Sequence, residues 1–322
     1  MKNIPLKIIV CLLLIVTPKP SLKAWGFYAH QKINRLAVFC LPPEMFGFYK
    51  KHIDYITEHA VDPDKRRYMV PGEDVKHFID MDYYETVLPF DTLPRSYQLA
   101  INKYSKDTLH TYGIVPWNIQ WTRKKLSEAF FEKDIARILK LSAELGHYIA
   151  DAHVPLHATS NYNGQKTGQN GIHAFFESNL PELFSYDYNF FVGKAHYVQY
   201  PLDETWQAVE GSFACLDSVL GFEKILQENF QGNKKYTYVK KGNALQRTYS
   251  EDFSAAYHQM LSGMVERRMI AAIKVVASFW YTAWVDAGQP ELDFQNHMTS
   301  DSINQEKFPS ILPDFMLGRQ EN

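Results

Sequence analysis

The chain has 322 residues, of which 46% are hydrophobic and 15% aromatic, so it can form one large domain or two small ones with a substantial core. This composition excludes a disordered or a collagen-like chain. The formal net charge of −2 excludes general nucleic-acid binding by electrostatics alone, and any phosphate group must be attracted locally.

The N-terminal segment differs from the rest of the chain. Two lysines precede an apolar run at residues 8–16, and a short polar stretch follows it. This pattern is typical of a secretory signal, and the run is shorter than the roughly 20 residues of a membrane-spanning helix. We expect a signal peptide at residues 1–24, cleaved between Ala24 and Trp25, and export to the periplasm or the medium. The alternative is an uncleaved anchor. Cleavage would change the formal charge from −2 to −6.

The remaining chain has the apolar periodicity of helices. In residues 121–153, for example, Ile138, Leu145 and Ile149 lie on one stripe, and Pro155 follows. Helices are expected over residues 30–39, 43–61, 121–153, 171–180, 201–221 and 250–286, with short extended pieces at 195–200 and 235–241. The sequence therefore predicts an all-α protein with a single large domain at residues 25–290 and a polar tail at 291–322.

The chain has three cysteines. Cys11 lies in the predicted signal peptide. Cys40 and Cys215 remain after cleavage and could pair in an exported protein, but spacing alone does not decide whether they do.

Four short stretches concentrate histidines and carboxylates. They contain Trp25 and His30; Asp62 and His77; His147, Asp151, His153 and His157; and His173 and Glu177. The third stretch is the densest. His147 and Asp151 are four residues apart on a predicted helix, so their side chains share one face and can bind one metal. This face is roughly opposite the apolar stripe, so an exposed ion pair is the alternative.

Further histidines strengthen the case for a metal centre. His157 follows the helix-breaking Pro155 and can turn back toward the same region. His173 and Glu177 repeat the four-residue spacing on the next predicted helix. Imidazole and carboxylate together suit zinc, with other divalent metals as alternatives.

Asp62 and His77 flank a basic and aromatic loop. The charged residues of this loop could instead pair with one another; they are Asp64, Arg66, Arg67, Glu73 and Asp74. His77, which precedes Phe78, could equally be a histidine of the core.

Together, nine of these positions resemble the zinc-dependent phospholipase C and S1/P1 nuclease superfamily. Their order is a tryptophan at the mature N-terminus, then His, Asp, His, His-x3-Asp-x5-His and His-x3-Glu. The resemblance covers residues 25 to 177 and implies a helical cleft that holds three zinc ions.

The resemblance also implies the ligands. One zinc would take Asp62, His77, His147 and Asp151; a second would take His157, His173 and Glu177; the third would take His30, Asp151, and the amino nitrogen and carbonyl oxygen of Trp25. Asp151 would bridge two metals. Because a free amine is a good ligand and an amide nitrogen a poor one, signal cleavage would complete the third site.

The chemistry that the resemblance implies is hydrolysis of a phosphodiester. Neighbouring zinc ions would lower the pKa of a shared water toward about 7, and the resulting hydroxide would attack phosphorus. Asp62 and Asp151 are the expected catalytic residues. Outside the ligand set, we expect His59 to orient a ligand and His153 to lie behind the ligands or at the surface.

The substrate class remains open between phospholipid and single-stranded nucleic acid. The short spacing from Trp25 to His30 resembles the nuclease branch, whereas Glu177 resembles the phospholipase branch, because the nucleases end with aspartate. Pro63 follows Asp62, where a choline-binding phospholipase has an aromatic residue.

We expect an exported, phospholipase C-like zinc hydrolase that contacts a membrane surface transiently. The alternatives are an S1/P1-like nuclease for single-stranded DNA or RNA and a metal-stabilised binding protein without turnover.

Overall fold

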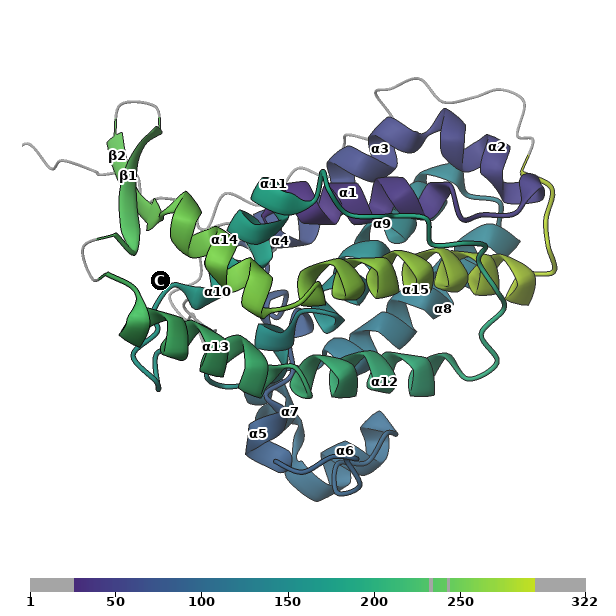
Figure 1. Cartoon of the computed structure of the whole chain (residues 1–322). Helices are drawn as coiled ribbons and strands as arrows, with labels where there is room; N and C mark the ends of the chain where they lie inside the picture. Colours follow the sequence, from purple (N-terminus) through teal and green to yellow (C-terminus); the bar gives the residue numbers. More distant parts are fainter. Residues whose placement is uncertain (1–25, 232–233, 242–243, 293–322) are drawn as a thin grey trace, which may run out of the picture.

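The computed structural model describes residues 26–231, 234–241 and 244–292. Helices make up the regular structure of these residues, apart from one antiparallel two-stranded hairpin (Figure 1). The predicted all-α class is therefore confirmed. The expected signal peptide, Trp25 and nearly all of the expected tail lie outside the described residues, so the boundaries of the domain stay predictions.

Four long helices pack together in the centre of the molecule (Figure 1). They are α1 (Phe27–Val38), α8 (Val115–Phe131), α9 (Ile135–Ala152) and α15 (Met264–Asp286). Ile138, Leu145 and Ile149, which form the apolar stripe of α9, are buried. They belong to one hydrophobic core whose members come from all parts of the chain between Ala29 and Leu292. Large aromatic side chains fix the packing. Tyr49 stacks on Trp280 with ring centroids 5.0 Å apart, and the Trp280 indole donates a hydrogen bond to the Ser142 carbonyl.

The other helices and the hairpin surround this centre. Before α8 they are α2 (Pro43–Lys51), α3 (Ile53–Glu58), η1 (His59–Val61), α4 (Asp62–Arg66), η2 (Asp74–Lys76), α5 (Met81–Tyr84), α6 (Tyr97–Tyr104) and α7 (Lys106–Tyr112). After α9 they are η3 (Pro155–Ala158), α10 (Ile172–Ala174), η4 (Phe175–Asn179), α11 (Leu180–Phe184), α12 (Pro201–Phe213), α13 (Leu216–Asn229), β1 (Tyr236–Lys241), β2 (Ala244–Tyr249) and α14 (Glu251–Met260).

Two long predicted helices are each divided in the structure. The helix expected at 121–153 is α8 followed by α9, with a break at Lys133, whose φ is 56°. Asp134 then caps α9 by accepting a hydrogen bond from the Arg137 amide. The helix expected at 250–286 is α14 followed by α15, because Ser262 and Gly263 have φ values of 48° and 76°. Apolar periodicity continues across such breaks, so it does not reveal them.

Three other boundaries also differ from the predictions. Residues 43–61 and 201–221 each divide into shorter helices. Pro181 was expected to end the helix at 171–180, but it occupies the first turn of α11 and begins that helix, because proline needs no amide hydrogen there. The extended piece expected at 235–241 is confirmed as β1, whereas residues 195–200 form no strand.

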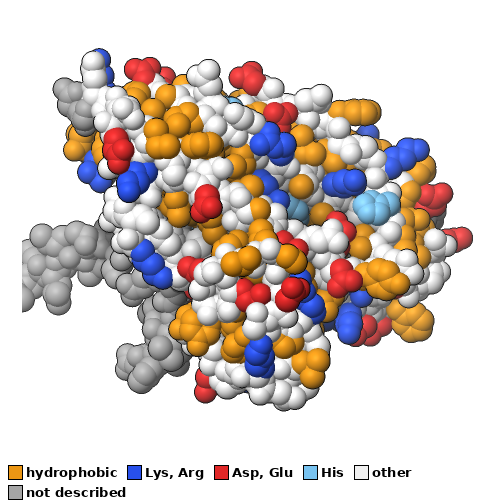
Figure 2. Space-filling view, turned by 60° about the horizontal axis from the view of Figure 1, so that its bottom comes forward, with side chains coloured by type: hydrophobic (Ala, Val, Ile, Leu, Met, Phe, Trp, Pro, Cys, Tyr) orange, Lys and Arg blue, Asp and Glu red, His pale blue; other side chains and the backbone are white. Residues whose placement is uncertain are grey.

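The surface carries mixed charge on the face nearest α5, α6 and α7. Figure 2 shows this face, on which acidic and basic side chains are interspersed among hydrophobic ones. Within the described residues, no helix has the length and apolar character that crossing a bilayer requires.

α1 and α9 approach each other closely at Gly146. The Asn34 side chain of α1 occupies the space where a Cβ of residue 146 would lie, and its amide donates a hydrogen bond to the Ala143 carbonyl at 3.0 Å. This approach brings His30 of α1 beside His147 of α9, with their rings stacked 3.9 Å apart. A residue without a side chain is therefore required directly before His147.

We expect Gly146→Ala to lower the free energy of unfolding by about 1–3 kcal/mol, since the added methyl group overpacks the interface with Asn34. Urea unfolding measures this change. The matched control is Gly221→Ala in α13, where no atom lies within 4 Å of the added Cβ. It should stabilise the protein by about 0.5–1 kcal/mol through helix propensity. Equal effects of the two substitutions would contradict the role of Gly146.

Candidate metal centre

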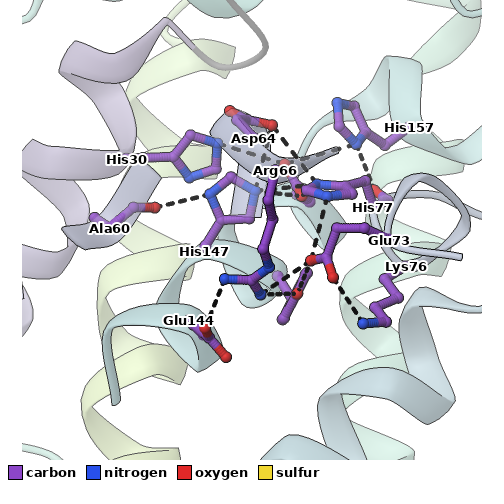
Figure 3. A network of polar contacts seen from close by, with 12 residues as sticks. His30, Ala60, Asp64, Arg66, Glu73, Lys76, His77, Glu144, His147 and His157 are labelled. Atoms are coloured by element: carbon purple, nitrogen blue, oxygen red, sulfur yellow. Dashed lines mark hydrogen bonds and ion pairs between the residues drawn. The ribbon is translucent and has the colours of Figure 1, made fainter. Parts of the chain in front are cut away.

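Buried histidines and carboxylates from several segments meet at one place. His30 comes from α1, His147 and Asp151 come from α9, and His77 follows η2 (Figure 3). The other members lie on η3, α10 and η4; they are His157, His173 and Glu177. The exposed fraction of these side chains is at most 4%. Because His147 and Asp151 are completely buried, the alternative of an exposed ion pair is excluded.

The ligand atoms fall into three groups, and within each group they all lie within 4.8 Å of one another. The groups are His30, His147 and Asp151; Asp64, His77 and His147; and His157, His173 and Glu177. Each group offers at least one imidazole and one carboxylate, which is the donor chemistry of zinc. The first two groups share His147, so they are adjacent. Because its Nδ1 faces the Ala60 carbonyl, His147 can bind a metal through Nε2 in only one of them.

The carboxylate of Asp151 lies in the middle of the centre. Its Oδ2 is 2.8 Å from His77 Nδ1 and 3.2 Å from His147 Nε2. Its Oδ1 is 3.5 Å from His30 Nε2 and 3.7 Å from His157 Nδ1. One carboxylate is thus within reach of imidazoles from all parts of the site, as a bridging ligand would be.

Backbone carbonyls orient three of the imidazoles. The Nδ1 atoms of His147, His157 and His173 lie 2.8, 2.6 and 3.1 Å from the carbonyls of Ala60, His77 and Tyr162, respectively. A carbonyl only accepts hydrogen bonds, so each Nδ1 carries the hydrogen. In the neutral form of each imidazole the lone pair is then on Nε2, which is how metal-ligating histidines are commonly oriented.

The protonation states also suit a metal. Burial lowers the pKa of His30, and it lowers the pKa of His77 to about 3, so both are neutral near pH 7. Burial opposes ionisation of Asp151, but His147 and His157 beside it hold its pKa well below the usual range. The neutral imidazoles of His30 and His77 beside an ionised Asp151 suit a divalent cation.

Two further carboxyl groups are left without hydrogen bonds. Within the described part of the chain, neither oxygen of Asp64 and neither oxygen of Glu177 accepts one. Burial raises the pKa of Asp64 to about 8, and the charges of Asp151 and Glu177 contribute to this rise. Buried carboxyl groups normally have partners, because an unpaired buried charge is costly. Imidazole nitrogens lie 3.2 and 3.4 Å from the Glu177 oxygens and 3.6 and 3.7 Å from Asp64 Oδ1. A cation held between these atoms would compensate both carboxylates, so these residues fit a metal centre.

The structure corrects one predicted ligand. Asp62 lies outside the three groups, is 31% exposed, and pairs with His59 at 2.5 Å and Lys65 at 2.8 Å. Asp64 instead faces His77 and His147 at 3.7 and 3.6 Å. Both aspartates belong to α4, and two residues along a helix turn a side chain by about 200°, so only one of them can face the centre. The sequence contained an indication that Asp62 pairs locally, since His59 and Lys65 lie three residues away on either side.

Other residues have structural roles. His59 binds Asp62 and therefore orients no member of the three groups. His153 is buried outside these groups, and its Nδ1 lies 2.7 Å from the Ile149 carbonyl. Cys40 and Cys215 are both free thiols.

A second polar network lies beside the centre (Figure 3). Arg66 contacts Glu73 at 3.1 Å and Glu144 at 2.6 Å, and Tyr148 donates a hydrogen bond to Glu73. Glu73 Oε1 lies 3.9 Å from Nε2 of His77. The interpretation that charged residues of this loop pair with one another is thus correct for Arg66 and Glu73.

Comparisons with known proteins find similar solved structures, among them two clostridial toxins. No protein-family profile and no curated protein matches the chain. The fold is similar to the alpha toxin of Clostridium absonum, with 12% identity, a TM-score of 0.44, and coverage of 86% of this chain and 66% of that one. It is also similar to the Clostridium perfringens alpha-toxin from avian strain SWCP, with 11% identity, a TM-score of 0.47, and coverage of 85% and 66%. The chain thus spans just under two thirds of the length of each toxin.

Whether Asp64 rather than Asp62 is a zinc ligand can be tested directly. We expect Asp64→Asn to weaken zinc binding by at least about tenfold, because it removes a charged donor that faces His77 and His147. Asp62→Asn, two residues away on the same helix, should leave zinc binding unchanged. Metal content after equilibrium dialysis measures both effects. Loss of zinc from the Asp62 variant alone would restore the original prediction.

The second polar network predicts a pH dependence of stability. Burial opposes ionisation of Glu73, but Arg66, His77 and Lys76 lower its pKa from 4.5 to about 2. The resulting stabilisation is present above pH 4.5 and is lost as the pH falls through 2.

We therefore expect Glu73→Gln to lower the free energy of unfolding at pH 7 by up to about 3 kcal/mol, with a smaller difference at acidic pH. Urea unfolding of chelator-treated protein across this pH range provides the measurement. The exposed Glu128 of α8 is the control, and Glu128→Gln should change stability by less than about 0.5 kcal/mol at every pH. A difference for Glu73→Gln that does not vary with pH would contradict the assignment.

Proposed function

We propose that this protein is a zinc-dependent hydrolase of phosphoric esters, of the phospholipase C type. The observation that carries this proposal is that three buried groups of imidazoles and carboxylates meet at one place. Two of the groups share His147, and the Asp151 carboxylate lies between histidines of all three. The order and spacing of these residues also resemble those of the zinc-dependent phospholipase C and S1/P1 nuclease superfamily.

The residues of the chain provide the conditions for such a reaction. Bound cations would displace the proton of Asp64, so Asp64, Asp151 and Glu177 would together bring three negative charges. Three divalent cations would exceed them, so an acidic protein can still attract a phosphate group at this place. Zinc bound here would lower the pKa of a water molecule toward about 7 and offset charge on the phosphoryl oxygens. The carbonyls that hold His147, His157 and His173 keep the donors in position and limit rearrangement during the reaction.

The phospholipid class of substrate is favoured by the presence of Glu177, as in the phospholipase branch. If Asp64 rather than Asp62 is the ligand, the residue that follows the ligand is Lys65 rather than Pro63. Lys65 is half exposed and basic, so an aromatic residue for a choline headgroup is again lacking at this position. A phosphodiester with another headgroup agrees better with these residues.

Export and the role of Trp25 are part of the same proposal. Gly26, the first described residue, lies against Ser178, and a Cβ at position 26 would meet Ser178 Oγ at 2.8 Å. Ser178 directly follows Glu177 on η4, so the chain immediately after Trp25 runs beside the proposed centre. A free amine at Trp25, produced by cleavage after Ala24, would then be available as a ligand.

Two assays test the function. Protein that begins at Trp25 should contain about three zinc ions per chain and hydrolyse a phosphodiester, and chelation should abolish this activity reversibly. Asp151→Asn should lower the rate by at least about a thousandfold, since several kcal/mol of transition-state stabilisation depend on the metals. Phosphatidylcholine, phosphatidylglycerol, single-stranded DNA and RNA should be compared in parallel.

The outcomes separate the alternatives. Hydrolysis of DNA or RNA but of neither lipid would assign the chain to the nuclease branch. A protein that binds zinc and hydrolyses none of these substrates would be a metal-stabilised binding protein, in which Asp151→Asn lowers stability only. One zinc ion or none per chain would contradict the proposed centre.

A further inference from the structure

The β-hairpin stands apart from the helical body at one end of the molecule (Figure 1). Its register pairs Tyr238 with Arg247 and Lys240 with Leu245. Side chains alternate between the two faces of a strand, so these four residues share one face of the hairpin. This face combines two cations with an aromatic and an aliphatic side chain.

The charge of this segment differs from that of the whole chain. Residues 231–250 contain five lysines and arginines and no acidic residue, although the chain has a formal net charge of −2. Lys235 is buried and paired with Glu223 at 2.7 Å, so its charge is compensated. Lys234, Lys240 and Arg247 are exposed to solvent. The hairpin therefore presents uncompensated positive charge, unlike the mixed surface in Figure 2.

Large apolar side chains are exposed beside these cations. The exposed fractions are 67% for Tyr238 and 72% for Leu245, both on the face of the two cations, whereas Val239, 45% exposed, lies on the opposite face. A single exposed apolar residue needs no explanation, but two beside two cations on a projecting element mark an interaction site. The partner of this surface must accept aliphatic groups and carry negative charge.

The base of the hairpin is fixed to the proposed metal centre. Tyr249 stacks on Phe175 with ring centroids 3.8 Å apart, and the Asn179 amide donates a hydrogen bond to the Thr248 hydroxyl at 2.8 Å. Phe175 and Asn179 belong to η4, which also carries Glu177. The position of the hairpin is therefore coupled to the segment that supplies donors to one metal group.

We propose that the hairpin docks onto an anionic lipid surface, with Lys240 and Arg247 at the level of the phosphates and Leu245 and Tyr238 in the interface. Basic side chains are attracted to anionic headgroups, and tyrosine favours the boundary between lipid and water. A single-stranded nucleic acid would match the cations and Tyr238, but it offers no apolar medium for Leu245. Docking requires no hydrolysis, so it is independent of the proposed function.

Vesicle sedimentation tests this proposal with the full chain. Vesicles of phosphatidylcholine alone are compared with vesicles of an equimolar mixture with phosphatidylglycerol, at low and high salt. The wild type should bind the anionic vesicles more tightly, and salt should weaken this binding. Lys240→Gln with Arg247→Gln should weaken it by about fivefold for each cation removed. Leu245→Ser, which leaves the charge unchanged, should weaken it by about tenfold.

Matched controls lie on α8. Lys124→Gln with Lys125→Gln removes two exposed cations, and Phe131→Ser removes a side chain that is 75% exposed. Both controls should bind like the wild type. Equal binding by the hairpin variants and the controls, or no preference of the wild type for anionic vesicles, would overturn the proposal.

Binding of the hairpin to nucleic acid or to a second copy of the chain would give different results. If the hairpin substitutions weaken binding of single-stranded DNA but leave vesicle binding unchanged, or abolish a dimer in analytical ultracentrifugation without affecting vesicles, the proposal is wrong. A protein that binds vesicles through the hairpin but hydrolyses no phosphodiester supports docking and contradicts only the proposed function. A protein that hydrolyses a phosphodiester but does not bind vesicles supports the proposed function and contradicts docking.

Discussion

The burial of the Asp151 carboxylate is the constraint on which the rest of the structure depends. An ionised carboxylate in the interior is stable only with close partners, and four imidazoles from different segments lie around this one. To supply them, α1 must approach α9 at Gly146, and the chain beyond α9 must turn back through η3. The contacts that pack the central helices therefore also set the geometry of the site.

The chemistry follows from the same burial. Low exposure keeps His30 and His77 neutral, and hydrogen bonds from Nδ1 to backbone carbonyls direct the Nε2 atoms of three other histidines toward the carboxylates. The ligand atoms of each group lie within 4.8 Å of one another, which is close enough for a common cation. The hairpin adds a different property, because its cations and apolar side chains lie outside the core. Its contact with η4 connects an external surface to the interior site.

The sequence predicted much of this site, because helical geometry is local. Spacing of four residues is sufficient to place His147 with Asp151 and His173 with Glu177 on common faces. The all-α class followed from apolar periodicity for a similar reason. The predictions failed where a single residue changes direction, as at Lys133 and Ser262, since periodicity does not register one left-handed residue. They also failed at Asp62, because the choice between two aspartates of one short helix depends on how that helix is rotated against α9.

The sequence alone thus determined the helical class, the pairs of donors within each helix and the cationic composition of residues 231–250, all of which depend on neighbours in the chain. Only the tertiary structure decided that Asp64 rather than Asp62 faces the centre, that His147 and Asp151 are buried rather than exposed, and that the hairpin stands apart with its apolar residues in solvent. These properties depend on contacts between segments that are distant in sequence, and they are set by which surfaces the packed helices bury together.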